Sequence, residues 1–232
     1  MSLPVLLYTI PRSRGTASLM RCKRQNKINE PFEVERQLLI RNALPEFWFL
    51  RLKKVEQTFD SLVDWNKIVA EMNSPDSCTK IHGGHLEFYR PGKSWYENVL
   101  ATRSHSIFVV EREDRENMLL SMLLAHYHGW NTWEQGTLEI KPCTIEDTVI
   151  RKLKFTITSY IKNYPTYGTV VTFDTLPTEF FVPEKNEASD QHSYLRHHYI
   201  TNLDFCKEII ADLLDYYKEE WDDKIKSIRS NA

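Results

Sequence analysis

Glycine is scarce in this chain. It contains 7 glycines among 232 residues, where an average usage of about 7% would give about 16. No two of them have the Gly-x-Gly spacing, so the dinucleotide-binding fingerprint of Rossmann domains is absent. Gly92-Lys93-Ser94 matches the end of a Walker A loop, but Glu87 occupies the position of that loop's first glycine. Any phosphate site must therefore be built with very little glycine.

An excess of one charge and long apolar runs are also missing. Thirty Lys and Arg against 32 Asp and Glu leave a net charge of -2, which argues against a nucleic-acid partner. The apolar run Val5 to Ile10 is too short to span a membrane, and no basic segment precedes it as in a signal peptide. The four cysteines contain no Cys-x-x-Cys pair, so we expect buried thiols in a reducing compartment. These features predict a soluble, cytoplasmic protein with a single domain over residues 1–232.

The order of predicted elements indicates an α/β fold. Mostly apolar runs predict buried strands at 5–10, 107–110 and 169–173, with a shorter strand near 79–81. Helical spacing predicts helices at 16–26, 35–57, 59–72, 115–127 and 203–228, and a further helix is expected to open at Thr144-x-x-Asp147 and to run to about residue 163. Asp114 is a predicted N-cap, Thr144-x-x-Asp147 resembles a capping box, and residues 73–94 are predicted to be mostly loop. Strands that alternate with helices predict a three-layer sandwich around a central parallel sheet.

The turn Pro11-Arg12-Ser13-Arg14-Gly15-Thr16 joins the first strand to the first helix. Ligands of α/β sheets bind at such junctions, where backbone N–H groups and the helix dipole favour anions. The first 29 residues contain six basic residues and no acidic one. This asymmetry fits a phosphate or sulfate site, and it also fits an ordinary turn followed by a solvated basic helix face.

The same turn resembles the 5′-phosphosulfate loop of sulfotransferases that use 3′-phosphoadenosine 5′-phosphosulfate (PAPS). That loop usually reads Pro-Lys/Arg-Ser-Gly-Thr/Ser-Thr, so Arg14 and Gly15 depart from the pattern. The resemblance implies that Arg12 stabilises the transferring group. It also implies a 5′-binding loop made of Arg12, Ser13, Arg14, Gly15, Thr16 and Ala17.

A second segment resembles the 3′-phosphate site of the same family. There an Arg closes a central strand and a Ser lies on the following helix, as Arg112 and Ser121 do here. The segment is similar to the subfamily that includes the bacterial trehalose 2-sulfotransferase, whose pattern is roughly Arg-Arg-Glu-Asp-Lys before the Ser. Glu111 replaces one of the arginines of that pattern. The resemblance implies a P-loop fold of the sulfotransferase type, with PAPS as donor and 3′-phosphoadenosine 5′-phosphate (PAP) as product.

The base that accepts the acceptor's proton has several candidates. Residues 29–34 resemble the subfamily's Gly-x-Pro-x-Glu-Tyr segment, which implies Glu33 as the base. Glu30 and Glu35 lie close by, and other sulfotransferases use a histidine, so His105 stays open as well.

Two further cations are weaker candidates for the same site. Lys80 ends a predicted strand in a segment similar to one of the family, and Arg196 lies where family members close a basic loop over the cofactor.

The resemblance thus implies transfer of a sulfuryl group to a hydroxyl of a carbohydrate or small metabolite. One alternative is a P-loop phosphotransferase that uses Gly92-Lys93-Ser94, with Asp174 as a magnesium carboxylate, although we interpret the triplet as an ordinary turn. Another is a non-catalytic relative that binds nucleotide, favoured by Arg14 and Glu111. The histidines have no recognised zinc spacing, so no metal site is predicted. The C-terminal helix could pack on its own sheet or on a second copy, which leaves a homodimer open.

Overall fold

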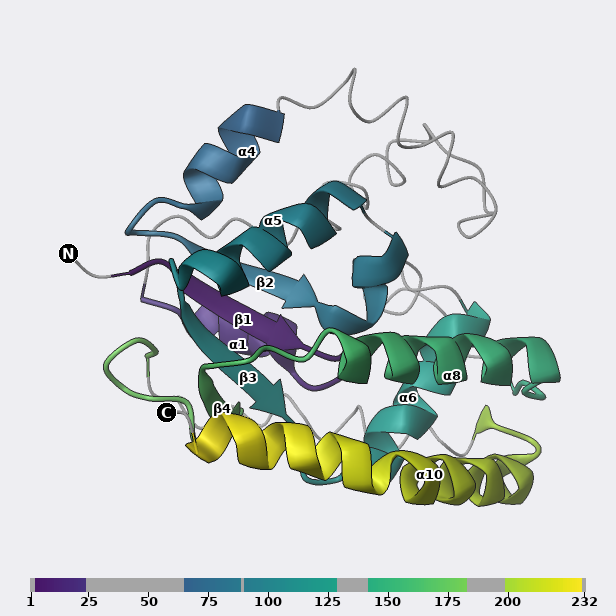
Figure 1. The fold of residues 1–232 in the computed structure, drawn as a ribbon. Coiled ribbons are helices and arrows are strands. Elements are labelled where there is room, and N and C mark those ends of the chain that lie inside the picture. The colour runs from purple at the N-terminus through teal and green to yellow at the C-terminus, as the bar shows by residue number, and fades with distance from the viewer. Residues whose placement is uncertain (1–2, 24–64, 89, 129–141, 183–198, 231–232) are drawn as a thin grey trace.

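A four-stranded sheet, all of whose strands are parallel, forms the centre of the structure (Figure 1). The computed structural model describes residues 3–23, 65–88, 90–128, 142–182 and 199–230. The sheet comprises β1 (Val5–Thr9), β2 (Cys78–His82), β3 (Ser106–Glu111) and β4 (Thr169–Thr172), in the order β2-β1-β3-β4. The predicted α/β fold with a central parallel sheet is therefore confirmed. Because the strands are parallel, their carboxyl ends meet at one edge of the sheet.

Helices connect the strands. The described helices are α1 (Gly15–Arg21), α4 (Trp65–Met72), the 3-10 helix η2 (Gly83–Phe88), α5 (Arg90–Thr102), α6 (Arg115–His128), α8 (Asp147–Lys162) and α10 (Leu203–Ser230). Within this set α6, α8 and α10 pack against one another, and Figure 1 shows them together beside the sheet. None of the described helices is both long and apolar enough to cross a membrane.

Strand β1 divides the core into two clusters. Its side chains alternate between the faces of the sheet: Leu6 and Tyr8 pack with residues of α5, α6, α8 and α10, while Val5 and Leu7 pack with residues of α1 and the segment after β4. All five residues of β1 are fully buried, as expected for a parallel strand covered on both faces. The four cysteines are buried free thiols, as predicted: Cys22, Cys78, Cys143 and Cys206.

Helix α1 is shorter than the predicted helix over residues 16–26. It ends at Arg21, because Cys22 adopts an extended conformation and forms an antiparallel bridge with Phe181. Lys23 N then donates to Phe180 O at 2.9 Å, which continues the pairing. A contact with a segment far along the chain therefore overrides the local helical pattern.

Helix α5 corrects the predicted loop over residues 73–94. Pro91 and Gly92 look like helix breakers in sequence, but they lie at the beginning of α5, where proline needs no intrahelical N–H bond. Gly92-Lys93-Ser94 is therefore the beginning of a helix and not an ordinary turn. The short predicted strand near 79–81 is confirmed as β2.

One of the two predicted helix caps is confirmed. Asn117 N donates to Asp114 Oδ1 at 3.0 Å, so Asp114 caps α6 as predicted. The predicted capping box before α8 is wrong. Thr144 Oγ1 lies 2.7 Å from Thr201 Oγ1, and the residue at the N-cap of α8 is Glu146, which forms no side-chain cap bond.

Candidate functional site

The loop after β1 contains two arginines with left-handed backbone conformation. Arg12 has φ 70° and Arg14 has φ 65°. The turn is closed by Ser13 N, which donates to Ile10 O at 3.1 Å. A residue with a side chain loses about 1–2 kcal/mol in this conformation, and such strain collects at functional sites. Glycine would adopt this conformation without that cost, and arginine at position 14 instead adds a charge.

Gly15 is needed for a different reason. A Cβ atom at this position would lie 2.6 Å from Thr9 Cγ2, because the beginning of α1 lies directly against the end of β1. A side chain at position 15 would fit only if Thr9 shifted, so glycine at this position matches the close packing of α1 on β1.

The two predicted anion-binding segments meet in the structure. Arg12 Nε donates to Ser121 Oγ at 2.9 Å, which joins the loop after β1 to helix α6. Arg112 Nη1 donates to the carbonyl oxygen of Arg12 at 3.1 Å, which joins the same loop to the end of β3. Residues 12, 112 and 121 thus form one contact network at the carboxyl edge of the two central strands, where α/β sheets bind ligands.

A cavity of about 310 Å³ opens beside this network. Its lining comes from the ends of β1, β3 and β4: Ser13, Arg14, Glu111, Arg112, Glu113, Asp114, Thr172, Phe173, Asp174 and Thr175. The hydroxyl of Ser13 is buried and has no hydrogen-bond partner among the described residues. Leaving a buried polar group unpaired costs roughly 1–3 kcal/mol, a loss that a bound anion would recover.

The segment after β4 forms the far wall of the cavity. Arg14 Nη1 lies 3.8 Å from Asp174 Oδ1, and its guanidinium carbon lies 5.1 Å from the centre of the Phe173 ring. Arg21 lies over the same ring at 4.8 Å and donates to Phe173 O at 2.8 Å, which fixes this wall to α1. Asp174, the candidate magnesium carboxylate, lies beside an arginine and is largely exposed.

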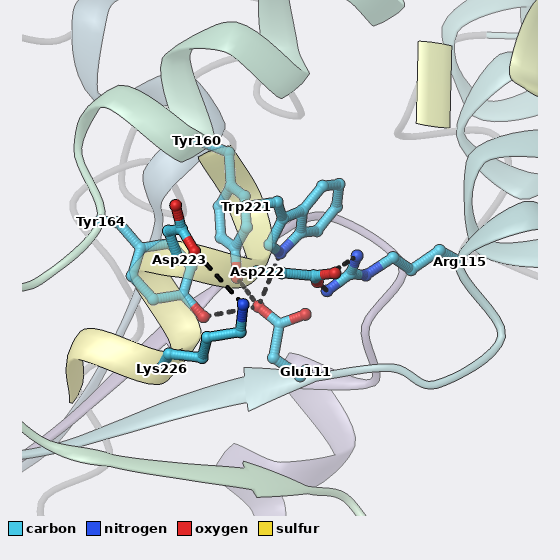
Figure 2. A network of polar contacts seen from close by, with 8 residues as sticks. All are labelled: Glu111, Arg115, Tyr160, Tyr164, Trp221, Asp222, Asp223 and Lys226. Atoms are coloured by element: carbon cyan, nitrogen blue, oxygen red, sulfur yellow. Dashed lines mark hydrogen bonds and ion pairs between the residues drawn. The ribbon is translucent and has the colours of Figure 1, made fainter. Parts of the chain in front are cut away.

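Glu111 lines the cavity as the last residue of β3, but its carboxylate is buried among donors from the core. Glu111 Oε1 accepts hydrogen bonds from Tyr160 OH at 2.5 Å, Tyr164 OH at 2.9 Å and Trp221 Nε1 at 3.3 Å (Figure 2). Burial, and then the charge of Glu111, raises the pKa of both tyrosines, so they stay protonated donors at neutral pH.

Sequence reasoning missed this network entirely. Glu111 stands out as a single carboxylate at the end of an apolar strand, and that is the one local signal it leaves. A buried carboxylate needs donors, but nothing local says that they come from α8 and α10. The three donors satisfy the buried carboxylate of Glu111 in the core.

Other candidates lie elsewhere. Lys80 is buried in β2, in register with Leu7, and so shares the face of the sheet on which α1 packs. His105 directly precedes β3, whereas Arg112 directly follows it, so a six-residue strand of roughly 20 Å separates them. His105 Nε2 lies 3.1 Å from Met72 O, and burial lowers the pKa of the ring. The structure therefore does not bring His105 to the cavity.

Several predicted site residues lie outside the described part of the chain. They are Glu30, Glu33, Glu35 and Arg196. Thr16 and Ala17 lie in the first turn of α1, and Ala17 is exposed.

Lys93 is engaged in an ion pair near η2. Its Nζ lies 2.7 Å from Glu87 Oε1, which also accepts from Asn163 Nδ2 at 3.1 Å and lies 3.3 Å from Lys162 Nζ. Burial opposes ionisation of Glu87, but the hydrogen bonds from Lys93, Asn163 and Lys162 outweigh it and lower the pKa. Gly92-Lys93-Ser94 is thus part of a local structural contact.

The described residues include no group of three His, Cys, Asp or Glu side chains arranged to hold a metal ion. His82 instead pairs with Thr9, whose Oγ1 lies 2.8 Å from its Nδ1.

Comparison with known proteins adds no family. No protein-family model, no curated protein and no solved structure matches this chain.

Proposed function

We propose that this chain is a PAPS-dependent sulfotransferase with a single α/β domain of the P-loop sulfotransferase type, acting on a hydroxyl of a carbohydrate or small metabolite. The contact between Arg12 and Ser121 carries this proposal. Each residue belongs to a segment that resembles one half of a PAPS site, and the two halves share a single network. Nothing in the two motifs taken separately requires them to touch.

The groups around the cavity have the chemistry that such a donor needs. Guanidinium groups bind phosphate and sulfate oxygens through paired hydrogen bonds. The proposed 5′ site consists of Arg12, Ser13 and Arg14 with the backbone of residues 15–17, and Ser13 Oγ contributes a hydroxyl that has no partner in the described chain. The proposed 3′ site consists of Arg112 and Ser121, with Arg196 added from the sequence.

The proposed reaction is a direct transfer. PAPS, when bound, supplies a sulfuryl group activated by its link to phosphate. The acceptor oxygen forms a bond to sulfur while the bond from sulfur to the bridging oxygen breaks, so PAP leaves. The hydroxyl proton passes to a carboxylate, for which Glu33 is the candidate from sequence. Arg12 stabilises the negative charge that grows on the bridging oxygen, where a fixed cation contributes most.

The phosphotransferase alternative has less support. Its lysine, Lys93, pairs with Glu87 at 2.7 Å, and its carboxylate, Asp174, lies beside Arg14. No observation on the described residues favours it over the sulfotransferase.

A ligand panel tests the proposal. We expect PAP to raise the melting temperature more than ADP, ATP or inorganic sulfate does, because PAP alone offers phosphates at both the 3′ and 5′ positions. Equal shifts with PAP, ADP and ATP would favour the phosphotransferase. The absence of a shift with every nucleotide would contradict a nucleotide site.

Turnover separates an enzyme from a binding module. With radiolabelled PAPS and a set of sugar and metabolite acceptors, Arg12→Ala should lower transfer by about 100-fold or more, and Arg12→Lys should retain part of it. Transfer by Arg12→Ala at the wild-type rate would show the proposed mechanism to be wrong. Binding of PAP without transfer by the wild type would indicate the non-catalytic relative.

A further inference from the structure

The loop between β3 and α6 is held at both ends by helix α10. This loop contains Arg112. It follows Glu111, the last residue of β3, and precedes Arg115, the first residue of α6. Figure 2 shows Glu111 bonded to Trp221 of α10, and Arg115 bonded to the next residue of that helix, Asp222. A helix more than 100 residues further along the chain therefore contacts the loop on both sides of Arg112.

The contact at Glu111 is buried. Trp221 Nε1 lies 3.3 Å from Glu111 Oε1, and the indole is 1% exposed. Tyr160 packs edge-on against the indole, with ring centres 5.5 Å apart, and donates to the same carboxylate oxygen. This contact fixes the end of β3 immediately before Arg112.

The contact at Arg115 combines an ion pair with ring packing. Arg115 Nη1 and Nη2 each lie 3.1 Å from Asp222 Oδ1. The guanidinium carbon lies 4.2 Å from the centre of the Trp221 ring, within the range of a favourable cation–π contact. This contact fixes the beginning of α6 immediately after the loop.

Arg112 transmits this constraint to the loop after β1. Its Nη1 donates to Arg12 O at 3.1 Å, and Arg12 in turn contacts Ser121 of α6. A binding group that is held in place before the ligand arrives loses less conformational entropy when the ligand binds. The backbone that carries Arg112 is therefore supported on both sides, through the contacts of Glu111 and Arg115 with α10.

We infer that Trp221 and Asp222 of α10 are positioning residues for Arg112, and that α10 thereby sets the affinity of the cavity for its anionic ligand. The identity of that ligand as PAP or PAPS rests on the function proposed above. The positioning of Arg112 does not, because it follows from contacts within the chain.

Helix α10 offers a matched control. Asp223 follows Asp222 and pairs with Nζ of Lys226 of the same helix at 3.3 Å, and both of these side chains are largely exposed. We compare Asp222→Ala with Asp223→Ala. Alanine favours a helix more than aspartate does, so neither change opposes the helix itself. Asp222→Glu restores the charge, and Trp221→Phe removes the Nε1 donor while keeping a buried ring.

Two measurements are made on each variant. The first is the Nε–Hε signal of Arg112 in ¹⁵N spectra without ligand, assigned with Arg112→Lys. The second is the dissociation constant for PAP by calorimetry. We expect Asp222→Ala and Trp221→Phe to shift or broaden the Arg112 signal and to weaken PAP binding about fivefold, within the range that packed networks transmit. Asp223→Ala should change neither, and Asp222→Glu should recover most of the loss.

The inference is overturned if the Arg112 signal in Asp222→Ala and Trp221→Phe matches that of Asp223→Ala. It is also overturned if Asp223→Ala weakens PAP binding as much as Asp222→Ala does. Wild-type protein that does not bind PAP would contradict the proposed function instead, and the ligand-free Arg112 signal would still decide the positioning.

Discussion

Arg12 Nε donates a hydrogen bond of 2.9 Å to Ser121 Oγ, although the two residues are 109 positions apart in the chain. The contact joins the loop after β1 to α6, next to a cavity that Arg14 and Arg112 line. An arginine in this position has a fixed direction before any ligand binds.

Replacing Ser121 with alanine should weaken binding of PAP by roughly tenfold or more, because a hydrogen bond to a charged group contributes about 1.5–3 kcal/mol. The change removes the acceptor for Arg12 and a proposed donor to the 3′-phosphate. Calorimetric titration gives the dissociation constant. Ser94→Ala is the control, since Ser94 is exposed on α5. If Ser94→Ala weakens nucleotide binding and Ser121→Ala does not, the phosphotransferase alternative becomes the better one.

Replacing Arg14 with glycine should separate stability from binding. The left-handed backbone at φ 65° costs arginine about 1 kcal/mol that glycine does not lose, so the free energy of unfolding should rise or stay level while anion binding falls. Arg103→Gly is a matched control, because Arg103 has φ 51° and lies on the surface away from the cavity. Urea denaturation and PAP titration measure both quantities. Equal losses of binding in the two variants would contradict a role for Arg14 in the site.

Replacing Gly15 with alanine should destabilise the protein by about 1–3 kcal/mol, the usual cost of adding a methyl group to a packed site. The new Cβ would lie 2.6 Å from Thr9 Cγ2 and would push α1 away from β1. Binding of PAP should fall as well, because the loop joins these two elements. A variant with wild-type stability and affinity would show that this contact relaxes without consequence. Adding Thr9→Ser, which removes the nearest atom, should restore part of the loss.

Acidification should destabilise the protein through His105. Burial lowers the pKa of this ring below its usual value near 6.5, so the unfolded chain takes up a proton first as the pH falls. The free energy of unfolding should therefore decrease as the pH drops below about 6.5, down to the folded-state pKa. Urea denaturation of wild type and His105→Gln at pH 7.5 and 5.5 isolates the effect. The difference in the free energy of unfolding between wild type and His105→Gln should be smaller at pH 5.5 than at pH 7.5. A difference that does not change with pH would contradict the role of His105.

His105 also bears on the choice of base. If it were the catalytic base, His105→Gln would abolish sulfuryl transfer even at a pH where the protein is fully folded. Its place at the amino end of β3 leads us to expect transfer to persist in that variant.

The strands could be predicted from the sequence because each is a short apolar run bounded by a turn signal. β1, β3 and β4 end within two residues of their predicted ends. Local sequence carried less information where a distant segment decides the structure. The end of α1 depends on pairing with Phe181, and α5 was hidden by Pro91 and Gly92 at its beginning.

The candidate site, too, could be predicted from the sequence only in part. Charge drew attention to Arg12, and the resemblance implied Arg112 and Ser121, but only the sheet order brings these residues into contact. The hydrogen-bond donors of Glu111 could not be predicted, because the sequence around a carboxylate does not indicate which distant residues donate to it. They come from residues 160, 164 and 221, on two helices that the sheet brings together.

The position of β1 in the middle of the sheet also affects how the protein is made. Val5 pairs with Cys78 of β2 and with Ser106 of β3, so β1 must wait about five to twenty seconds until both partners are synthesised. Until then its unpaired backbone N–H and C=O groups are exposed to other chains, a common route to aggregation for parallel sheets. Arg12 and Arg14 follow that strand closely. The arginines beside the cavity of the folded protein therefore also place positive charge next to this aggregation-prone strand during synthesis.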